Sequence, residues 1–346
     1  MSPDPLKDKK IFIGFNSAGA VGIYEFTRVL KNRGYQIDFY GIGKIRFNMP
    51  VDFLLKFSPG KFRNFLERLV YFFRLLPSYD IWHLNYAEVF FFYPLNLFIL
   101  KLWGKKIICT FRGADIRTGF NIPIKLPASF EERFGFWRNL KRRLRMKIFV
   151  FFADKVILTG PFLVPYVNSF DAIIPYARNI PKIKPQNHQP NNIKLVIHAP
   201  SNPAAKGTEI VSRVFQKLAR QYPKIKFQII SGLNYQQLQQ LLAKSDIVID
   251  QLLVGWYGGV AVEAMALEKP VLVFINPNYL PYISYADKLP IINTNIWQLE
   301  SDLEFYLNHP EICRLKGAEG YKFVKKFHHC QKIADQYQQI YLQVLK

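Results

Sequence analysis

The stretch from residue 246 to residue 274 constrains the fold of this chain most. A β-branched run at 247–249 is followed by a glycine-bearing loop, an apolar helix-forming segment, Pro270 and a second apolar run. This order predicts strand, loop, helix and strand, because Pro270 ends the helix before the next strand begins. The loop turns backbone N–H groups toward an anion, which the helix dipole also attracts. Glu263, one turn into that helix, would accept two hydrogen bonds from sugar or ribose hydroxyls.

Short apolar segments also alternate with helix-forming segments along the rest of the chain. Regular alternation of this kind predicts parallel strands covered by helices on both faces. The expected strands lie at 11–15, 36–40, 80–84, 106–111, 155–158, 172–175, 194–199, 226–230, 246–249, 271–274 and 290–293. We therefore predict an α/β protein with two Rossmann-like domains whose parallel sheets face a central cleft.

The composition changes between Tyr176 and Asn192, where proline, asparagine and lysine residues cluster. Such a stretch marks a linker. With 346 residues, the chain is long enough for two cores. We expect an N-terminal Rossmann-like domain over 1–178, a linker over 179–192, a C-terminal Rossmann-like domain over 193–320 and a final helix over 321–346.

The sequence offers no segment that suits membrane insertion. The start of the chain lacks the apolar core of a signal peptide, and the longest apolar run, 89–100, is interrupted by Pro94 and Asn96. A spanning helix needs about 20 apolar residues. The three cysteines are scattered, which favours reduced thiols. We therefore expect a cytoplasmic protein.

The formal charge of +22 lies mainly in the first half of the chain, where residues 1–180 hold 28 Lys and Arg against 13 Asp and Glu. An excess of this size predicts an anionic partner. Two amphipathic stretches carry much of it, at 61–76 and 137–151. Their apolar stripes are Phe62, Phe65, Leu66, Leu69, Phe73 and Leu76 in the first, and Trp137, Leu140, Leu144, Ile148 and Phe151 in the second.

Two interpretations of these stretches stay open. Each stripe would face a core if the basic side were simply solvated. Alternatively, aromatic and basic helices bind an anionic membrane surface. Under the second interpretation we expect Arg142, Arg143 and Arg145 to lie on the solvent side. A nucleic-acid partner is suggested by charge alone, since no nucleic-acid motif is present.

The stretch at 246–274 resembles the donor-site signature of the retaining family 4 glycosyltransferases, which have the GT-B fold. That family places two glutamates eight positions apart, with an aromatic residue and a glycine between them. Tyr257, Gly258 and Glu263 match the aromatic residue, the glycine and the second glutamate, and the following Ala-Met-Ala and Pro-Val also match. The first glutamate, which the family associates with the transferred sugar, is replaced by Gly255. The resemblance also implies a C-terminal helix that crosses back to the first domain.

The loop after the expected strand at 194–199 resembles the phosphate-binding loop of the same family. Lys206 and Gly207 precede a helix, and Lys206 suits a diphosphate. The family often has an arginine where Ser201 stands, so Ser201, Asn202 and backbone N–H groups would have to substitute for it. The alternative is an ordinary strand–helix loop. Together with Tyr257, Gly258, Gly259 and Glu263, these residues form the expected donor site.

In the first half, polar residues follow the expected strand at 106–111. Arg112 stands where the family commonly has a histidine, and it cannot act as a base because it stays protonated. It could neutralise a leaving diphosphate, with Asp115 as the second catalytic candidate, or the two could form a structural ion pair. We expect Gly19, Gly22 and His83 to bind the acceptor, although His83 could equally be a buried structural histidine.

The resemblance implies a glycosyltransferase of the hexosyltransferase type that retains configuration and uses neither a metal nor a cofactor. His328 and His329 do not indicate a metal site, because adjacent helical residues point apart. We expect a nucleotide-sugar donor and a saccharide or lipid-linked acceptor, at the inner face of the cell membrane. The alternative is a non-catalytic nucleotide-sugar or polyanion-binding protein on a degenerate GT-B scaffold.

Overall fold

The computed structural model describes residues 4–15, 21–42, 51–85, 90–113, 116–117, 136–180 and 193–346, with only the backbone of Tyr93 and 136–138. The chain divides into two compact units. Residues up to 117, 136–177 and 330–346 belong to the first unit, and Arg178–His329 form the second. Most of the predicted linker, 181–192, lies outside the described residues.

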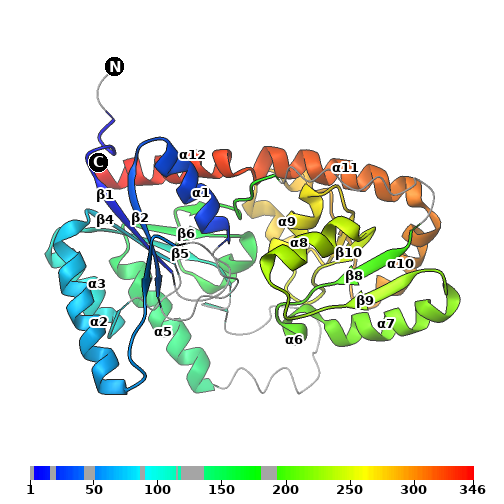
Figure 1. Ribbon diagram of the computed structural model, residues 1–346, viewed down its shortest axis with the longest axis horizontal. Helices are drawn as coiled ribbons and strands as arrows, with labels where there is room; N and C mark the ends of the chain where they lie inside the picture. Colours follow the sequence, from blue (N-terminus) through cyan, green and yellow to red (C-terminus); the bar gives the residue numbers. More distant parts are fainter. Residues whose placement is uncertain are drawn as a thin grey trace. The chain divides into compact units, whose positions relative to one another are not determined.

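The first unit contains a seven-stranded sheet in which all neighbouring strands run parallel (Figure 1). The strand order is β3-β2-β1-β4-β5-β6-β7. The strands are β1 (Lys10–Phe15), β2 (Gln36–Ile42), β3 (Phe53–Leu55), β4 (Ile81–Asn85), β5 (Lys106–Phe111), β6 (Lys155–Leu158) and β7 (Ala172–Ile173). The central strands are buried because helices cover both faces of a parallel sheet.

One face of this sheet is covered by α1 (Val21–Asn32) and the C-terminal α12 (Cys330–Leu345). Ile13 and Ile81 of the sheet share one buried cluster with Phe26 of α1 and Tyr337 of α12. Phe26 and Tyr337 stack with ring centroids 4.0 Å apart. The last helix of the chain is therefore part of the core of the first unit.

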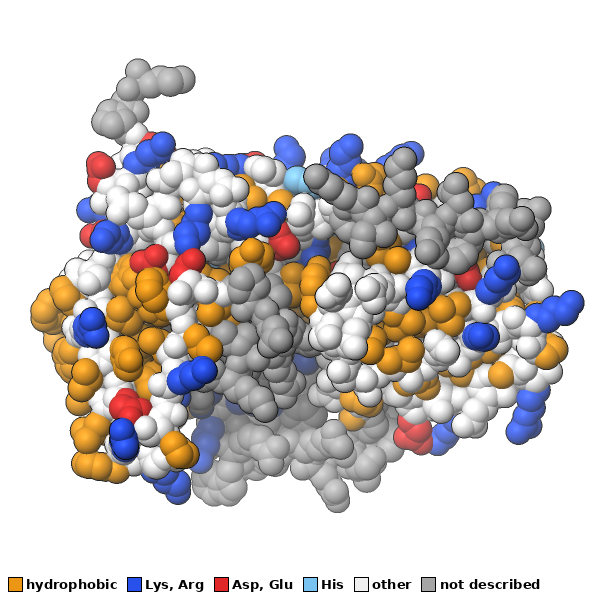
Figure 2. All heavy atoms as spheres, in the orientation of Figure 1, with side chains coloured by type: hydrophobic (Ala, Val, Ile, Leu, Met, Phe, Trp, Pro, Cys, Tyr) orange, Lys and Arg blue, Asp and Glu red, His pale blue; other side chains and the backbone are white. Residues whose placement is uncertain are grey.

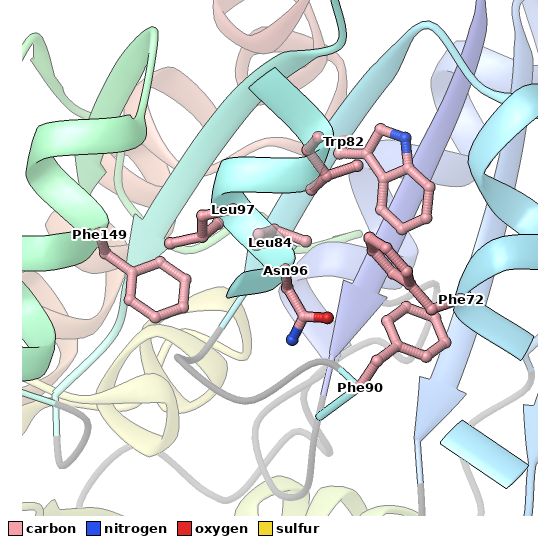
Figure 3. A pocket seen from close by; sticks show the side chains of 8 residues that line it. Phe72, Trp82, Leu84, Phe90, Asn96, Leu97 and Phe149 are labelled. Carbon is pink, nitrogen blue, oxygen red and sulfur yellow. The ribbon is translucent and has the colours of Figure 1, made fainter. Parts of the chain in front are cut away.

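The other face is covered by α2 (Lys61–Leu75), α3 (Tyr93–Leu102) and α5 (Phe136–Phe152). These helices converge on β4 around a small apolar cavity (Figure 3). Phe72 of α2, Leu97 of α3 and Phe149 of α5 line it together with Trp82 of β4. All three helices thus pack on the same side of the sheet. Short 3-10 helices follow α2 (Leu76–Ser78) and β6 (Pro161–Tyr166).

The second unit contains a five-stranded parallel sheet of order β12-β11-β10-β8-β9. Its strands are β8 (Leu195–His198), β9 (Lys226–Ile229), β10 (Ile247–Ile249), β11 (Val271–Val273) and β12 (Ile292–Asn293). The helices are α6 (Pro203–Lys206), α7 (Thr208–Gln221), α8 (Tyr235–Lys244), α9 (Gly259–Ala266), α10 (Leu299–Asn308) and α11 (Pro310–Phe327), with 3-10 turns at Pro277–Tyr282 and Ala286–Lys288.

Helices α7 and α10 share a buried cluster with one face of this sheet. Val211 and Leu218 of α7 pack there with Leu303 of α10, at the spacing of one helical face. Helix α9 contacts β10 and β11 and packs closely on α11. The predicted α/β class, with two parallel Rossmann-like sheets, is confirmed. In the described part of the chain, every helix is too short or too polar to cross a bilayer.

Candidate functional site

The start of α9 is built by a glycine-containing loop that follows β10. Gly255 has φ +77°, a left-handed conformation that glycine adopts without strain. A Cβ atom at this position would lie 2.9 Å from Cβ of Asn276 and 3.0 Å from Cε2 of Tyr279. The loop therefore has no room for the glutamate that the resembling family carries here. The departure from the family pattern is built into the backbone.

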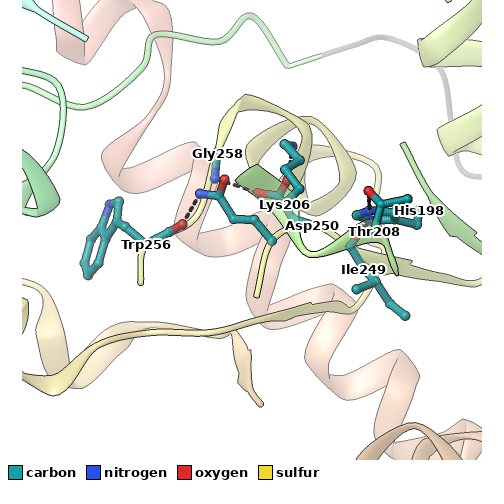
Figure 4. Close-up of polar contacts among 8 residues, drawn as sticks. His198, Lys206, Thr208, Ile249, Asp250, Trp256 and Gly258 are labelled. Carbon is teal, nitrogen blue, oxygen red and sulfur yellow. Dashed lines mark hydrogen bonds and ion pairs between the residues drawn. The ribbon is translucent and has the colours of Figure 1, made fainter. Parts of the chain in front are cut away.

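A buried carboxylate joins this loop to the lysine loop. Asp250 directly follows β10, and its Oδ2 accepts the backbone N–H of Gly258 at 2.6 Å (Figure 4). Its Oδ1 accepts a hydrogen bond from Nζ of Lys206. Lys206 ends α6, and Gly207 caps that helix with φ +76°. The predicted residues Lys206, Gly207 and Gly258 are thus brought together, and Asp250 is the group that holds them.

Glu263 forms a second buried ion pair on the first turns of α9. Its Oε1 lies 3.0 Å from Nη2 of Arg178. A Cβ atom on Gly259 would come within 2.6 Å of that guanidinium, so Gly259 leaves the space that Arg178 occupies. Burial raises the pKa of Glu263, and the charges of Arg178 and Lys206 oppose that rise. Oε2 of Glu263 is buried and has no hydrogen-bond partner among the described residues.

A buried histidine links β8, β10 and the start of α7. His198 Nδ1 lies 2.9 Å from the carbonyl oxygen of Ile249, so it must carry the proton and donate. Its Nε2, 2.9 Å from Oγ1 of Thr208, then accepts from the hydroxyl. Burial, together with the nearby charge of Lys206, lowers the pKa of His198 from 6.5 to about 4. His198 therefore stays neutral near pH 7 and fixes the loop geometry.

Acid should weaken the second unit through His198. Below pH 6.5 the unfolded histidine takes up a proton, whereas the folded one does not until about pH 4. Unfolding therefore binds a proton in this window, and the free energy of unfolding falls as the pH drops from 6.5 toward 4. Urea titrations of wild type and His198→Asn should differ in slope across this window, with the steeper fall in wild type. Parallel curves would contradict the assigned neutral state.

The remaining predicted donor residues, Ser201, Asn202 and Tyr257, have positions that are common in proteins without a ligand site. Oδ1 of Asn202 accepts the backbone N–H of Ala205 and caps α6. Ser201 is exposed. Tyr257 is buried, and its hydroxyl lies 3.0 Å from Nε2 of His328 within an aromatic cluster. Tyr257 therefore packs beneath the loop, and its ring is not at the surface.

In the first unit, His83 is fully buried in β4. Its Nδ1 lies 2.8 Å from the Tyr341 hydroxyl, and its Nε2 lies 2.7 Å from Oγ1 of Thr110. Burial, with Arg112 adding to it, lowers the pKa of His83 to about 3. Both ring nitrogens thus have protein partners, which agrees with the structural alternative.

Gly22 and Arg112 line a small pocket at the start of α1, together with Tyr176. The Arg112 guanidinium carbon lies 5.5 Å from the centre of the Tyr176 ring, and the Tyr176 hydroxyl donates to the carbonyl of Arg112 at 3.2 Å. Gly19 and Asp115 lie outside the described residues, so the suggested Arg112–Asp115 pair stays a prediction.

Sequence reasoning missed Asp250, Arg178 and His198. Asp250 and His198 both stand at the carboxyl ends of buried strands, a position that does mark site residues in parallel sheets. Arg178 had no such signal, because it precedes a proline-rich segment and meets Glu263 only through the fold.

No family model matches this chain, and no curated protein matches it by sequence. Solved structures do match. A sucrose-phosphate synthase from Thermosynechococcus elongatus has a TM-score of 0.68 at 16% identity, with 97% of this chain and 99% of that chain covered. HepE of Anabaena, in complex with UDP-glucose, has a TM-score of 0.59 at 13% identity, with 96% and 99% covered.

A UDP-N-acetylglucosamine 2-epimerase also matches, with a TM-score of 0.54 at 13% identity and 94% of both chains covered. At these identities the likeness shows the fold alone. The GT-B fold expected from the sequence is therefore confirmed. Because an epimerase shares this fold, the fold alone does not determine the reaction.

Proposed function

We propose that this chain transfers a sugar from a nucleotide-sugar to a saccharide or lipid-linked acceptor, with retention of configuration, in cell-surface polysaccharide or glycolipid biosynthesis. The observation that carries this proposal is Oε2 of Glu263. It is a buried carboxylate oxygen with no hydrogen-bond partner among the residues described, on the first turns of a helix that begins with Gly259. Such an oxygen suits a ribose hydroxyl donor.

The diphosphate of the donor would bind beside that carboxylate. The N-terminus of α9 supplies backbone N–H groups and the positive end of a helix dipole. Lys206 has three N–H donors, and Asp250 accepts from it, so donors remain for a phosphate oxygen. Arg178 adds a guanidinium at the same helix start. These cations would stabilise the leaving diphosphate by charge.

The transferred sugar needs a different holder from that of the resembling family, since Gly255 leaves no room for a side chain. We assign the acceptor to the first unit, near Gly22 and Arg112, with Asp115 as a further catalytic candidate. Arg112 would act as a fixed positive charge for an anionic group.

The alternative is a protein that binds a nucleotide-sugar or polyanion without transferring sugar. It is favoured by the replacement of three family residues at Gly255, Ser201 and Arg112. Nucleotide release separates the two functions. We expect at least one nucleotide-sugar, with uridine diphosphate donors tested first because HepE holds UDP-glucose, to release its nucleotide in the presence of the protein. Binding of the donor with no release, with or without saccharide acceptors, would favour the alternative.

Glu263→Gln should weaken binding of a nucleoside diphosphate by about tenfold, because a charged acceptor becomes a neutral one. Stability should fall as well, since the buried ion pair with Arg178 loses its negative charge. Calorimetry at a temperature well below unfolding measures the affinity. Glu209→Gln is the matched control, because Glu209 pairs with Arg213 on the exposed side of α7. Equal affinities of the two variants for the nucleoside diphosphate would show that Glu263 does not contribute to the binding site.

We place this reaction in the cytoplasm, at the inner face of the cell membrane, where a lipid-linked acceptor would be presented. The support is the excess of Lys and Arg in residues 1–180. Anionic headgroups attract such a surface within a Debye length.

A further inference from the structure

Most residues in the apolar stripes of the two basic stretches are exposed, although Leu76, at the end of the first stretch, is buried in the core. On α2 only Phe72 is buried, whereas Phe62, Phe65, Leu66 and Phe73 are exposed, Phe62 by 75%. The core-facing interpretation of these stretches is wrong for this helix. Phe72 is the fully buried side chain of α2, and its ring centroid lies 5.7 Å from that of Trp82 in the sheet.

Helix α5 repeats this arrangement. Met146 and Phe149 point into the unit, whereas Leu140, Leu144 and Phe151 are exposed, Phe151 by 81%. The three exposed residues follow helical spacing, so they form one stripe along the helix.

Helix α3 adds a third outward stripe that its sequence did not reveal. Leu95, Phe98 and Leu102 are exposed, and Phe92 and Trp103 at the two ends of the helix are exposed as well. Among the described residues, fifteen of the twenty exposed large hydrophobic side chains lie on α2, α3, α5, the ends of α3 and the neighbouring β3. Figure 2 shows hydrophobic side chains gathered over the end of the first unit that α2 and α3 form. We call the outward side chains of α2, α3 and α5 the apolar face.

We infer that the apolar face of the first unit inserts into the headgroup–acyl boundary of an anionic lipid surface. This inference rests on the proposed function, which assigns the reaction to a membrane surface, and it names the part of the protein that binds the lipid. A patch of large apolar side chains on three helices exceeds the scattered exposed residues normal for a soluble domain. Aromatic and leucine side chains beside basic residues are the pattern of interfacial helices.

The positive charge around the apolar face favours an anionic lipid surface as its partner over a second copy of the chain. Helices α2 and α5 contain ten Lys and Arg residues and one acidic residue, Glu67. Two such faces packed together would oppose like charges, whereas anionic headgroups complement them. Among the α5 side chains that the structure describes, the exposed basic ones are Lys141, Arg143 and Lys147.

The charge contribution can be tested on those three side chains. Arg142 and Arg145 are partly buried, and Arg142 donates to the carbonyl of Arg117 at 2.9 Å. The expectation that Arg142 and Arg145 lie on the solvent side is therefore wrong. Lys141→Gln, Arg143→Gln and Lys147→Gln together should weaken binding to anionic vesicles and flatten its salt dependence.

Insertion is tested by sedimentation of the full chain with vesicles of phosphatidylglycerol and phosphatidylcholine, against phosphatidylcholine alone. We expect binding to the anionic vesicles. Phe62→Ser with Phe98→Ser should weaken that binding by at least about tenfold, because two buried aromatic contacts are lost. Trp297→Ser with Leu315→Ser is the matched control, since both residues are exposed in the second unit. That control should change binding by less than about twofold.

Tryptophan fluorescence adds a depth measurement. Trp103 is 55% exposed at the end of α3, and brominated acyl chains should quench it. Trp103→Phe should lower the quenched signal. No binding to anionic vesicles at low salt, no quenching of Trp103, or equal effects of the two double variants would overturn the inference. So would light scattering that shows a dimer which Phe62→Ser with Phe98→Ser converts to a monomer.

The vesicle assays contain no nucleotide, so their results do not depend on whether the donor site binds one. Phe62→Ser with Phe98→Ser should bind a nucleoside diphosphate as wild type does. Vesicle binding with these properties in a chain that binds no nucleotide would keep this inference and reject the donor site, and the reverse result would do the opposite.

Discussion

Gly317→Ala is expected to lower the free energy of unfolding of the second unit by about 3 kcal/mol, because the added methyl group has no space. Gly317 lies on α11, where a Cβ atom would come within 2.0 Å of the carbonyl oxygen of Glu268. Glu268 follows the end of α9 and has φ 58°, so this backbone is already unusual. Gly320 lies one turn further along α11, and a Cβ atom there would come within 3.0 Å of Cγ of Met265 on α9.

The measurement is urea denaturation followed by circular dichroism. Gly60→Ala is the control, since nothing lies within 4 Å of the methyl group it would add. The two glycines bring α11 against α9, the helix that carries Glu263, so Gly317→Ala should also weaken nucleotide binding. A stability equal to that of Gly60→Ala would contradict the close approach of the two helices.

Lys206→Met should cost about 3–5 kcal/mol of stability, because it leaves the buried Asp250 carboxylate without its counter-ion. Asp250 is 1% exposed and Lys206 is 7% exposed. Adding Asp250→Asn should restore most of the loss, since the amide oxygen can still accept the N–H of Gly258 while the charge is gone. The double variant should thus be more stable than Lys206→Met alone.

Lys217→Met is the matched control, because Lys217 pairs with Glu300 at the surface and a surface pair contributes little. Equal stability of Lys206→Met and Lys217→Met would mean that the Lys206–Asp250 pair does not hold the two loops together. Affinities measured on Lys206→Met need correction for its folded fraction. A phosphate contact of this lysine would add a loss of about 1–3 kcal/mol in binding.

Most strands of both sheets could be predicted from sequence because they depend on local pattern, whereas the short edge strand β3 was not predicted. The strand expected at 226–230 is Lys226–Ile229 and that at 106–111 is Lys106–Phe111. Glu263, Gly258 and Lys206 were predicted because the strand–loop–helix segments that contain them resemble the donor-site pattern of a known family. The residues that hold these side chains in place could not be predicted from sequence. Asp250, which binds Lys206, lies 44 residues from it, and only the order of the strands brings the two together.

The side of each amphipathic helix that faces the core could not be predicted from sequence. Periodicity identifies an apolar stripe on a helix, but it does not say whether that stripe faces a core. On α2 and α5 the core contacts are made by Phe72, Met146 and Phe149, which leave the longer stripes outside. The sequence alone therefore could not choose between the two interpretations.

Calorimetric titration of the intact chain with nucleoside diphosphates tests the donor site most directly. One nucleotide should bind per chain, and Glu263→Gln should weaken that binding by about tenfold while Glu209→Gln leaves it unchanged. No binding of any nucleoside diphosphate or nucleotide-sugar by the folded wild-type protein would contradict the assignment of the α9 loop as a donor site.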